Sequence, residues 1–212
     1  MKITWLGHAC FKVENKDYII VFDPTDDNYV PGIGPIRDEA DYVFCSHEHA
    51  DHNAAHLIKL RDRDSVMPFI TTQIETYHDD QNGTLRGENL ITVIDDGKFR
   101  YAHLGDLGCI PDDEVIKELL DLDIVFIPVG GHYTIDGKEA AELIKMIAPK
   151  VTVPMHYRDE TEGFGFDVIS TVDDFLKEMS FVQTLEDSTV ELKKSEMEGN
   201  RVIVLKPKLL SN

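Results

Sequence analysis

Short runs of apolar and β-branched residues, bounded by polar turn residues, recur along the chain and predict strands. The run at 41–46 is almost continuously apolar, which is typical of a buried strand. An Asp-Gly pair at 96–97 predicts a tight turn between two of the runs. We expect strands at 3–6, 10–14, 18–23, 41–46, 90–95, 98–104, 123–128, 150–154, 181–186, 189–194 and 201–206.

Between these strands, several segments have the spacing of amphipathic helices. In 53–63 the residues Ala54, Leu57, Ile58 and Arg61 fall at i, i+3, i+4 and i+7. The segment 112–122 follows a proline and begins with acidic residues, as a helix N-terminus does. We also expect helices at 137–149 and 171–179.

Strands and helices alternate without a linker, a repeat or a low-complexity segment, so we expect a single domain over 1–212. The simplest packing for this order is an α/β sandwich, with sheets inside and helices outside. An apolar content of 42% and a charged content of 29% are typical of a globular protein, which excludes the disordered and fibrous classes.

The charge balance bears on possible partners. The chain has 21 basic and 40 acidic side chains and a net charge of −19, which repels polyphosphates and argues against nucleic acid as a partner. The start of the chain contains no long apolar stretch, and no run of about 18 apolar residues occurs, so we expect no signal peptide and no membrane span. Cys10, Cys45 and Cys109 lack disulfide-framework spacing, which predicts reduced thiols and a cytoplasmic location.

Residues 46–52, SHEHADH, concentrate imidazole and carboxylate groups directly after a predicted strand. Such side chains are rarely buried without a partner, so the segment does not serve a hydrophobic core. His47, His49, Asp51 and His52 are instead the ligand types of a divalent cation, zinc first, with manganese or iron as alternatives.

Four side chains cannot saturate two ions, and further candidates lie downstream. Asp106 and His156 directly follow predicted strands, at the edge where α/β folds place their sites, and His78 lies in a polar segment before them. The set fits two ions, one held by His47, His49 and His78, the other by Asp51, His52 and His156, with Asp106 bridging them. A hydroxide in the remaining bridging position would attack a carbonyl carbon or a phosphorus.

The sequence leaves the third ligand of the first ion open. His103 shares one face of its predicted strand with Phe99 and Tyr101, which favours a core position, but it is the next candidate ligand after His78. His56 lies within the predicted helix 53–63 and is interpreted as an ordinary helix residue.

The motif SHEHADH matches the H-x-H-x-D-H signature of the metallo-β-lactamase superfamily. The chain resembles the simpler hydrolase branch that includes ascorbate-6-phosphate lactonase-like proteins, and the resemblance spans nearly all of it. WLGHACF is similar to the first strand of the family, VFDP to its early aspartate and HLGDLG to its bridging-aspartate segment, while PVGGHYTIDGKEA and VTVPMHY match its late strand–loop–helix–strand. His78 follows His52 by only 26 positions, shorter than is typical of the branch, which indicates a missing helix or strand.

The resemblance implies an αββα sandwich, with two mixed sheets flanked by helices and a dimetal site at one edge. It implies that Asp23 orients the histidine loop and places His8 beside the site. Asp51 would orient the hydroxide and accept its proton, and His132 or Tyr133 would donate to the developing anion. Self-association is a further expectation from the family.

The function predicted is metal-dependent hydrolysis of a small ester, lactone or phosphoester, with a phosphodiesterase or nuclease as the second reading. A diiron oxidoreductase uses the same ligand set but normally needs a flavin or a second redox domain. A metal-binding protein without turnover would require the loss of a ligand, and the sequence lacks none.

Overall fold

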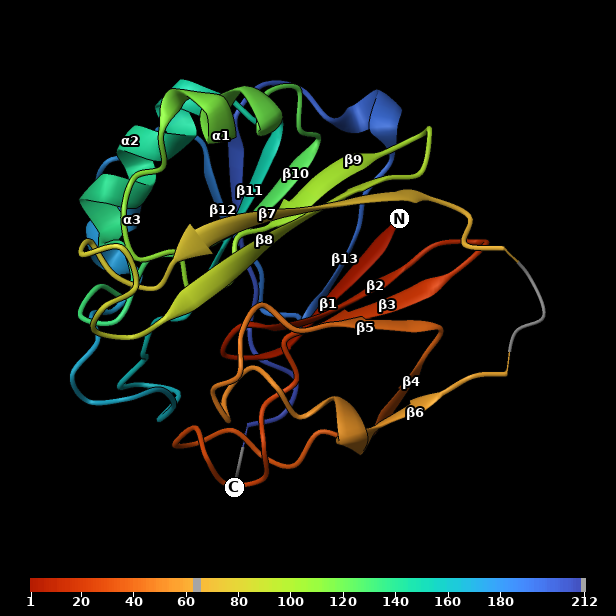
Figure 1. The fold of residues 1–212 in the computed structure, drawn as a ribbon, viewed down its shortest axis with the longest axis horizontal. Coiled ribbons are helices and arrows are strands. Elements are labelled where there is room, and N and C mark those ends of the chain that lie inside the picture. Colours follow the sequence, from red (N-terminus) through yellow and green to blue (C-terminus); the bar gives the residue numbers. More distant parts are fainter. Residues whose placement is uncertain (63–65, 211–212) are drawn as a thin grey trace.

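The computed structural model describes residues 1–62 and 66–210, and its centre is a pair of stacked β-sheets (Figure 1). All the predicted strands are present, and their ends lie within a few residues of the predicted positions. The strands are β1 Lys2–Gly7, β2 Cys10–Glu14, β3 Ile19–Phe22, β4 Asp38–Ala40, β5 Tyr42–Phe44, β6 Ile58–Leu60, β7 Ile70–Tyr77, β8 Glu88–Asp95, β9 Arg100–His103, β10 Ile124–Pro128, β11 Val151–Met155, β12 Val182–Thr184, β13 Thr189–Glu191 and β14 Arg201–Val204.

Both large sheets are mixed, as predicted. The five-stranded sheet has the order β13-β1-β2-β3-β5, and only its β3–β5 pair is parallel. The seven-stranded sheet has the order β12-β14-β11-β10-β9-β8-β7, in which β8 runs antiparallel to both of its neighbours and the remaining pairs are parallel. Aromatic side chains fill the space between the sheets, where the rings of Phe11 and Phe126 lie 4.5 Å apart.

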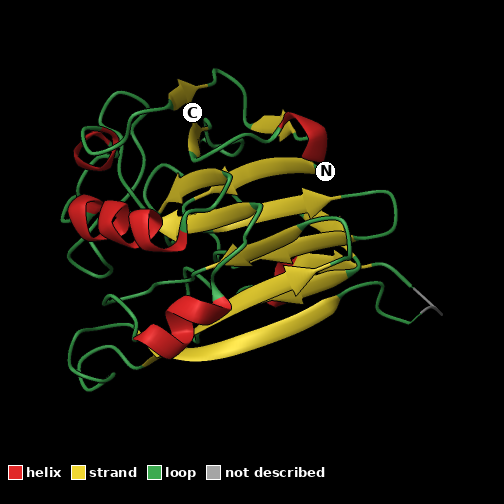
Figure 2. Cartoon of the chain, turned by 90° about the horizontal axis from the view of Figure 1, so that it is seen from above, coloured by secondary structure: helices red, strands yellow, loops and turns green. Residues whose placement is uncertain are grey.

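Three α-helices lie on the outer face of the seven-stranded sheet (Figure 2). They are α1 Asp113–Glu118, α2 Gly137–Ile147 and α3 Asp173–Leu176. The helix α2 begins with a capping box between Asp136 and Glu139 and buries one apolar face. The helix α1 is shorter than the predicted 112–122, because Asp121 adopts a left-handed backbone (φ 58°) that ends the helical path. None of the helices among the described residues is long and apolar enough to cross a membrane.

A 3₁₀ turn and a small two-stranded sheet, and not an α-helix, cover the outer face of the five-stranded sheet. The prediction of a helix at 53–63 is therefore wrong. This segment forms one 3₁₀ turn, η1 Ala55–Leu57, and then the strand β6, which pairs in parallel with β4. No side chain caps the turn. Ile58 instead packs with Leu6 and Val21 in a small core on this face, so tertiary burial overrides the helical spacing. Arg63, the last residue of the predicted helix, lies outside the described residues.

The described part of the segment between His52 and His78 contains a 3₁₀ turn and two strands. Besides η1 and β6 it contains β7, an eight-residue strand at the edge of the larger sheet that pairs with β8 along its whole length. A second short 3₁₀ helix, η2 Lys194–Glu196, follows β13, where the predicted strand continued to 194.

Strand direction decides where the polar loops meet. In the smaller sheet β1, β3 and β5 run the same way, because two antiparallel steps separate β1 from β3 and β5 is parallel to β3. In the larger sheet β7, β9, β10 and β11 run the same way for the same reason. The loops that follow these strands therefore gather at common edges of their sheets.

Candidate metal centre

The predicted ligands meet around one carboxylate, although their loops are far apart in the sequence. Oδ2 of Asp106, in the loop after β9, lies 3.2 Å from Nε2 of His52, 3.2 Å from Nε2 of His78 and 3.1 Å from Nε2 of His156. Nε2 of His47 is 3.9 Å away. Four imidazoles from the loops after β5, β7 and β11 thus surround a single oxygen atom.

The ligand atoms of this cluster form three groups, of which one, His47 with His52 and Asp106, links the other two. The ligand atoms of His47, His49 and His78 lie within 4.8 Å of one another, in the combination predicted for the first ion. Asp51, His52 and His156 form the second group, together with a fourth member, His8. The ligand role of these side chains remains a prediction, which the experiments below test.

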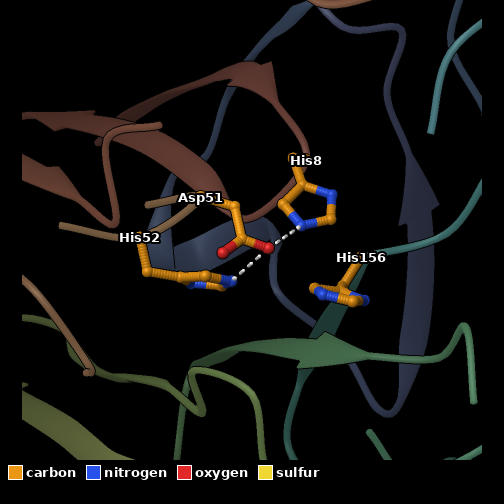
Figure 3. A group of neighbouring side chains, drawn as sticks. All are labelled: His8, Asp51, His52 and His156. Atoms are coloured by element: carbon orange, nitrogen blue, oxygen red, sulfur yellow. Dashed lines mark hydrogen bonds and ion pairs between the residues drawn. The ribbon is translucent and has the colours of Figure 1, made fainter. Parts of the chain in front are cut away.

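His8 lies in the turn between β1 and β2 and points toward the second group (Figure 3). Its Nε2 atom is 3.3 Å from Oδ2 of Asp51, and its ring lies 4.1 Å from that of His156. The side chain is fully buried. His8 therefore contacts the site directly, and its contact with Asp51 restrains that carboxylate.

Hydrogen bonds behind the cluster fix the orientation of the ligand rings. Asp23, which follows β3, accepts from the backbone N–H and the hydroxyl of Ser46, at 2.7 and 2.6 Å. It also lies 2.7 Å from Nδ1 of His52, and the Ser46 hydroxyl lies 2.9 Å from Nδ1 of His47. Because a carboxylate only accepts, Nδ1 of His52 carries a proton, and Nε2 is the ring atom that faces Asp106. Asp23 thus holds the start of the histidine loop and the His52 ring by hydrogen bonds.

His78 is oriented in the same way by a main-chain group. Its Nδ1 atom lies 3.1 Å from the carbonyl oxygen of Tyr133, which can only accept, so Nε2 is the free ligand atom. The loop of His78 reaches this position because Gly108 lets two backbones approach closely. A Cβ atom at Gly108 would lie 2.2 Å from the backbone nitrogen of Asp79.

The electrostatics of the cluster suit a cation. Burial, together with the charge of His52, lowers the pKa of His47 to about 3, so this ring is neutral at pH 7. Burial alone would raise the pKa of Asp106, but the neighbouring His156 and His52 outweigh it and keep this pKa well below the ordinary value. For His52 burial also opposes the charged form, yet the surrounding carboxylates raise its pKa well above the ordinary value. Binding of a cation would displace the His52 proton.

Several atoms at the centre have no hydrogen-bond partner although they are buried. Among the described residues they include Nε2 of His47, His52 and His156 and Oδ1 of Asp106. Unpartnered buried polar atoms are costly and rare, and here they converge on one point. Imidazole nitrogens and carboxylate oxygens are the donors that zinc and related ions accept. The residues present therefore fit divalent metal ions.

Two other histidines lie apart from the ligand groups. His103 uses both ring nitrogens in hydrogen bonds, with the Ala9 carbonyl at 2.9 Å and with the backbone N–H of Gly105 at 3.2 Å. Its ring stacks on Phe22 in the core, at 5.1 Å. His56 is exposed and lies near Asp26 on the surface. The geometry thus places His78, and not His103, with His47 and His49.

A cleft of about 260 Å³ opens directly onto the cluster. Four of its lining residues belong to the metal cluster, namely His49, Asp51, His78 and Asp106. The other five form the wall and are Tyr29, Leu85, Arg86, Tyr133 and Phe166. Tyr133 is part of this lining, whereas His132 is exposed beside it. Of the two predicted donors, the structure therefore places Tyr133, and not His132, in the lining of the cleft.

No sequence motif identified the remaining wall of the cleft. Tyr29, Leu85, Arg86 and Phe166 lie in irregular loops without a motif, and only the folding of those loops brings them to the metal cluster. Backbone strain marks the site as well. His8, Asp23, His132 and His156 all have left-handed backbones, with φ between 42° and 59°.

Comparisons with known proteins agree with this geometry. The model of the beta-lactamase superfamily domain matches residues 2–156. A UPF0173 metal-dependent hydrolase of Thermoplasma acidophilum is 31% identical over 187 residues, which cover 74% of this chain and 83% of the relative. A UPF0173 protein of Pyrococcus furiosus is also 31% identical, over 77% of this chain and 86% of its own length.

Solved structures extend the similarity over nearly the whole chain. The crystal structure of a Thermotoga maritima protein, assigned as a Zn-dependent hydrolase of the metallo-beta-lactamase superfamily, is 32% identical to this chain. It superimposes with a TM-score of 0.76 and covers 96% of this chain and 97% of its own. The fold, the histidine motif and these similarities lead to one assignment: the chain belongs to the metallo-β-lactamase superfamily.

Proposed function

We propose that this protein is a dinuclear metal-dependent hydrolase that cleaves a small-molecule ester, lactone or phosphoester. The observation that carries the proposal is the convergence of four imidazoles on Asp106 beneath an open cleft. The names of its UPF0173 relatives, which include metal-dependent hydrolases, support the same reaction class.

Each ion would be held by one of the two groups of side chains. His47, His49 and His78 would hold the first, and Asp51, His52 and His156 the second, with Asp106 contributing to both. Divalent ions at such sites polarise a substrate oxygen and lower the pKa of water, so that hydroxide is available near neutral pH.

The chain itself supplies positioning and proton transfer. Asp51 lies at the floor of the cleft, where its carboxylate can orient the attacking water and accept a proton. Tyr133 lies in the cleft wall, where its hydroxyl can donate to the oxygen on which negative charge develops. Asp23 and Ser46 keep the imidazoles of the histidine loop in the tautomers that the ions require.

The size of the cleft favours a small substrate. A volume of about 260 Å³ lies just below the usual range for small-molecule sites, about 300–1,000 Å³, and favours a small molecule over an extended polymer. The net charge of −19 also disfavours a polyanion. A small ester, lactone or phosphomonoester therefore ranks before a phosphodiester.

Elemental analysis of the purified protein tests this proposal first. We expect about two zinc or manganese ions per chain in the wild type and a clear loss of metal in both His47→Ala and His156→Ala. The matched control is His56→Ala, which removes an exposed histidine outside the cluster and should leave the metal content unchanged. The loaded protein is then assayed with a panel of lactones, carboxylic esters, phosphomonoesters and phosphodiesters.

Three results would contradict the proposal. One is a wild-type protein without metal above background after reloading. Another is full metal occupancy without hydrolysis of any class in the panel, which would indicate a binding protein. The third is bound iron with reducible visible absorption, which would indicate the oxidoreductase chemistry of a diiron site.

His8 provides a separate test of how Asp51 is held. The variant His8→Asn keeps a residue that tolerates the left-handed backbone (φ 53°) but removes the imidazole contact to Asp51. We expect kcat to fall by about 10–100-fold, the range found for groups that support metal ligands, while two ions remain bound. Metal loss in this variant would show instead that His8 is itself a ligand, and unchanged kcat would exclude a role in catalysis.

A further inference from the structure

Arg86 is the basic side chain in the wall of the cleft. Its guanidinium carbon lies 5.6 Å from the ring centre of Tyr133, so the charge is on the cleft side of the loop. The part of the chain that the structure describes offers it no carboxylate within ion-pair distance. Such an arginine is conspicuous in a chain with nearly twice as many acidic as basic side chains.

The loop that carries Arg86 is fixed by a buried carboxylate. Asp79 accepts four backbone N–H groups, from Gln81 and Gly83 through Oδ1 and from Leu85 and Arg86 through Oδ2, all at 2.8–2.9 Å. The ends of the loop are also joined, since the His78 N–H donates to the Gly87 carbonyl. Arg86 therefore projects from a rigid base adjacent to a predicted metal ligand, which limits the entropy lost when its side chain binds a ligand.

The rest of the cleft wall is apolar. Tyr29 and Phe166 contact each other with their rings 6.1 Å apart, and the Tyr133 ring lies 6.1 Å from Phe166. Leu85 completes this wall. The cleft thus has three chemically distinct parts, namely a metal cluster at its floor, an apolar wall and one guanidinium.

We propose that Arg86 is the recognition site for an anionic group, a phosphate or a carboxylate, on a substrate whose apolar body lies against Tyr29, Phe166 and Leu85. The guanidinium presents paired N–H donors that match either anion. Its local charge allows a small anion to bind although the protein as a whole repels anions. The inference names the substrate class and rests on the proposed function for the scissile bond, which lies at the metal cluster.

The test measures binding and not turnover, so its result is independent of whether hydrolysis is found. Benzylphosphonate, phenylacetate and neutral benzyl alcohol are titrated by calorimetry into wild type, Arg86→Gln and Arg86→Lys, each with zinc and with EDTA. The EDTA series separates the arginine from any metal, because a bound ion would also attract the anions. Arg201→Gln, which removes an arginine of β14 outside this cleft, is the matched control.

We expect Arg86→Gln to lower the affinity for both anions by about ten-fold or more, both with zinc and with EDTA. This is the effect of losing one charge-assisted contact. Benzyl alcohol should bind as before, Arg86→Lys should keep part of the affinity, and Arg201→Gln should keep all of it. A larger loss for the phosphonate identifies a phosphorylated substrate, and a larger loss for phenylacetate a carboxylated one.

Two results would overturn the inference. In one, the affinity of Arg86→Gln for the anions stays within about two-fold of the wild-type affinity. In the other, benzyl alcohol loses affinity as much as the anions do, which would mean that Arg86 shapes the cleft without recognising charge. If the zinc-free wild type binds the anions through Arg86 but no substrate is hydrolysed, the recognition site stands and the proposed reaction fails.

Discussion

Replacing Asp106 by alanine is expected to reduce hydrolysis below about 1% of wild type, since loss of a supporting group alone costs about 10–100-fold. The metal content should fall to one ion per chain or fewer. The reason is geometric, because a single oxygen of Asp106 lies 3.1–3.2 Å from three of the imidazoles that would hold the two ions. Plasma mass spectrometry and an assay of the substrate found in the panel measure the two effects.

The control for this variant is Asp112→Ala, in which the lost carboxylate caps α1 and lies outside the cluster. Circular dichroism of both variants in EDTA separates loss of metal from loss of fold. Two bound ions and full turnover in Asp106→Ala would refute the role of this residue, and with it the dinuclear site.

The replacement Asp23→Ala should have the largest effect on stability. The side chain is 1% exposed and accepts hydrogen bonds from the Ser46 backbone, the Ser46 hydroxyl and His52. Removing one partner of a buried charged pair costs about 3–5 kcal/mol. We expect that loss in the free energy of unfolding of the metal-free protein, measured by urea denaturation in EDTA.

The companion variant Asp23→Asn separates folding from metal binding. Asparagine tolerates the left-handed backbone at this position (φ 42°) and can still accept from Ser46, so the stability loss should be smaller than in the alanine variant. Its neutral amide is a weaker acceptor for His52 Nδ1–H and favours the other tautomer, so zinc affinity should fall by about 10–100-fold. Nitrogen-15 NMR of the His52 ring reports the tautomer directly. Wild-type zinc affinity in both Asp23 variants would exclude this orienting role.

The metal cluster was predictable because its signals are local. In SHEHADH the ligand types lie within six positions of one another after the strand β5, and Asp106 and His156 also follow strands. Asp106 and His156 follow parallel strands of one sheet and are delivered to the same edge of it, whereas the packing of the two sheets brings the histidine loop after β5 to them. In the structure the ligand atoms of His47, His49 and His78 lie together, and those of Asp51, His52 and His156 lie together with His8, which was not among the predicted ligands.

The covering of the smaller sheet was not predictable in this way. The spacing of Ala54, Leu57 and Ile58 satisfies a helix, but these residues form a 3₁₀ turn and a strand. When so few positions carry the helical spacing, the packing of the side chains decides the secondary structure of the segment. Here Ile58 packs on the outer face of the sheet. The strand β7 was missed because it lies at a sheet edge with most of its side chains exposed, so no buried face shows in its pattern.

The sequence by itself determined the family and the fold class, because ligand type, strand patterning and the order of elements are written in short segments. Only the tertiary structure decided which imidazole joined each group, placing His78 at the cluster and His103 in the core. It also decided that Tyr133 and Arg86 form the cleft wall while His132 faces outward. Loop residues carry no periodic signal, and their positions are set by contacts such as the four N–H groups around Asp79, which exist only once the chain has folded.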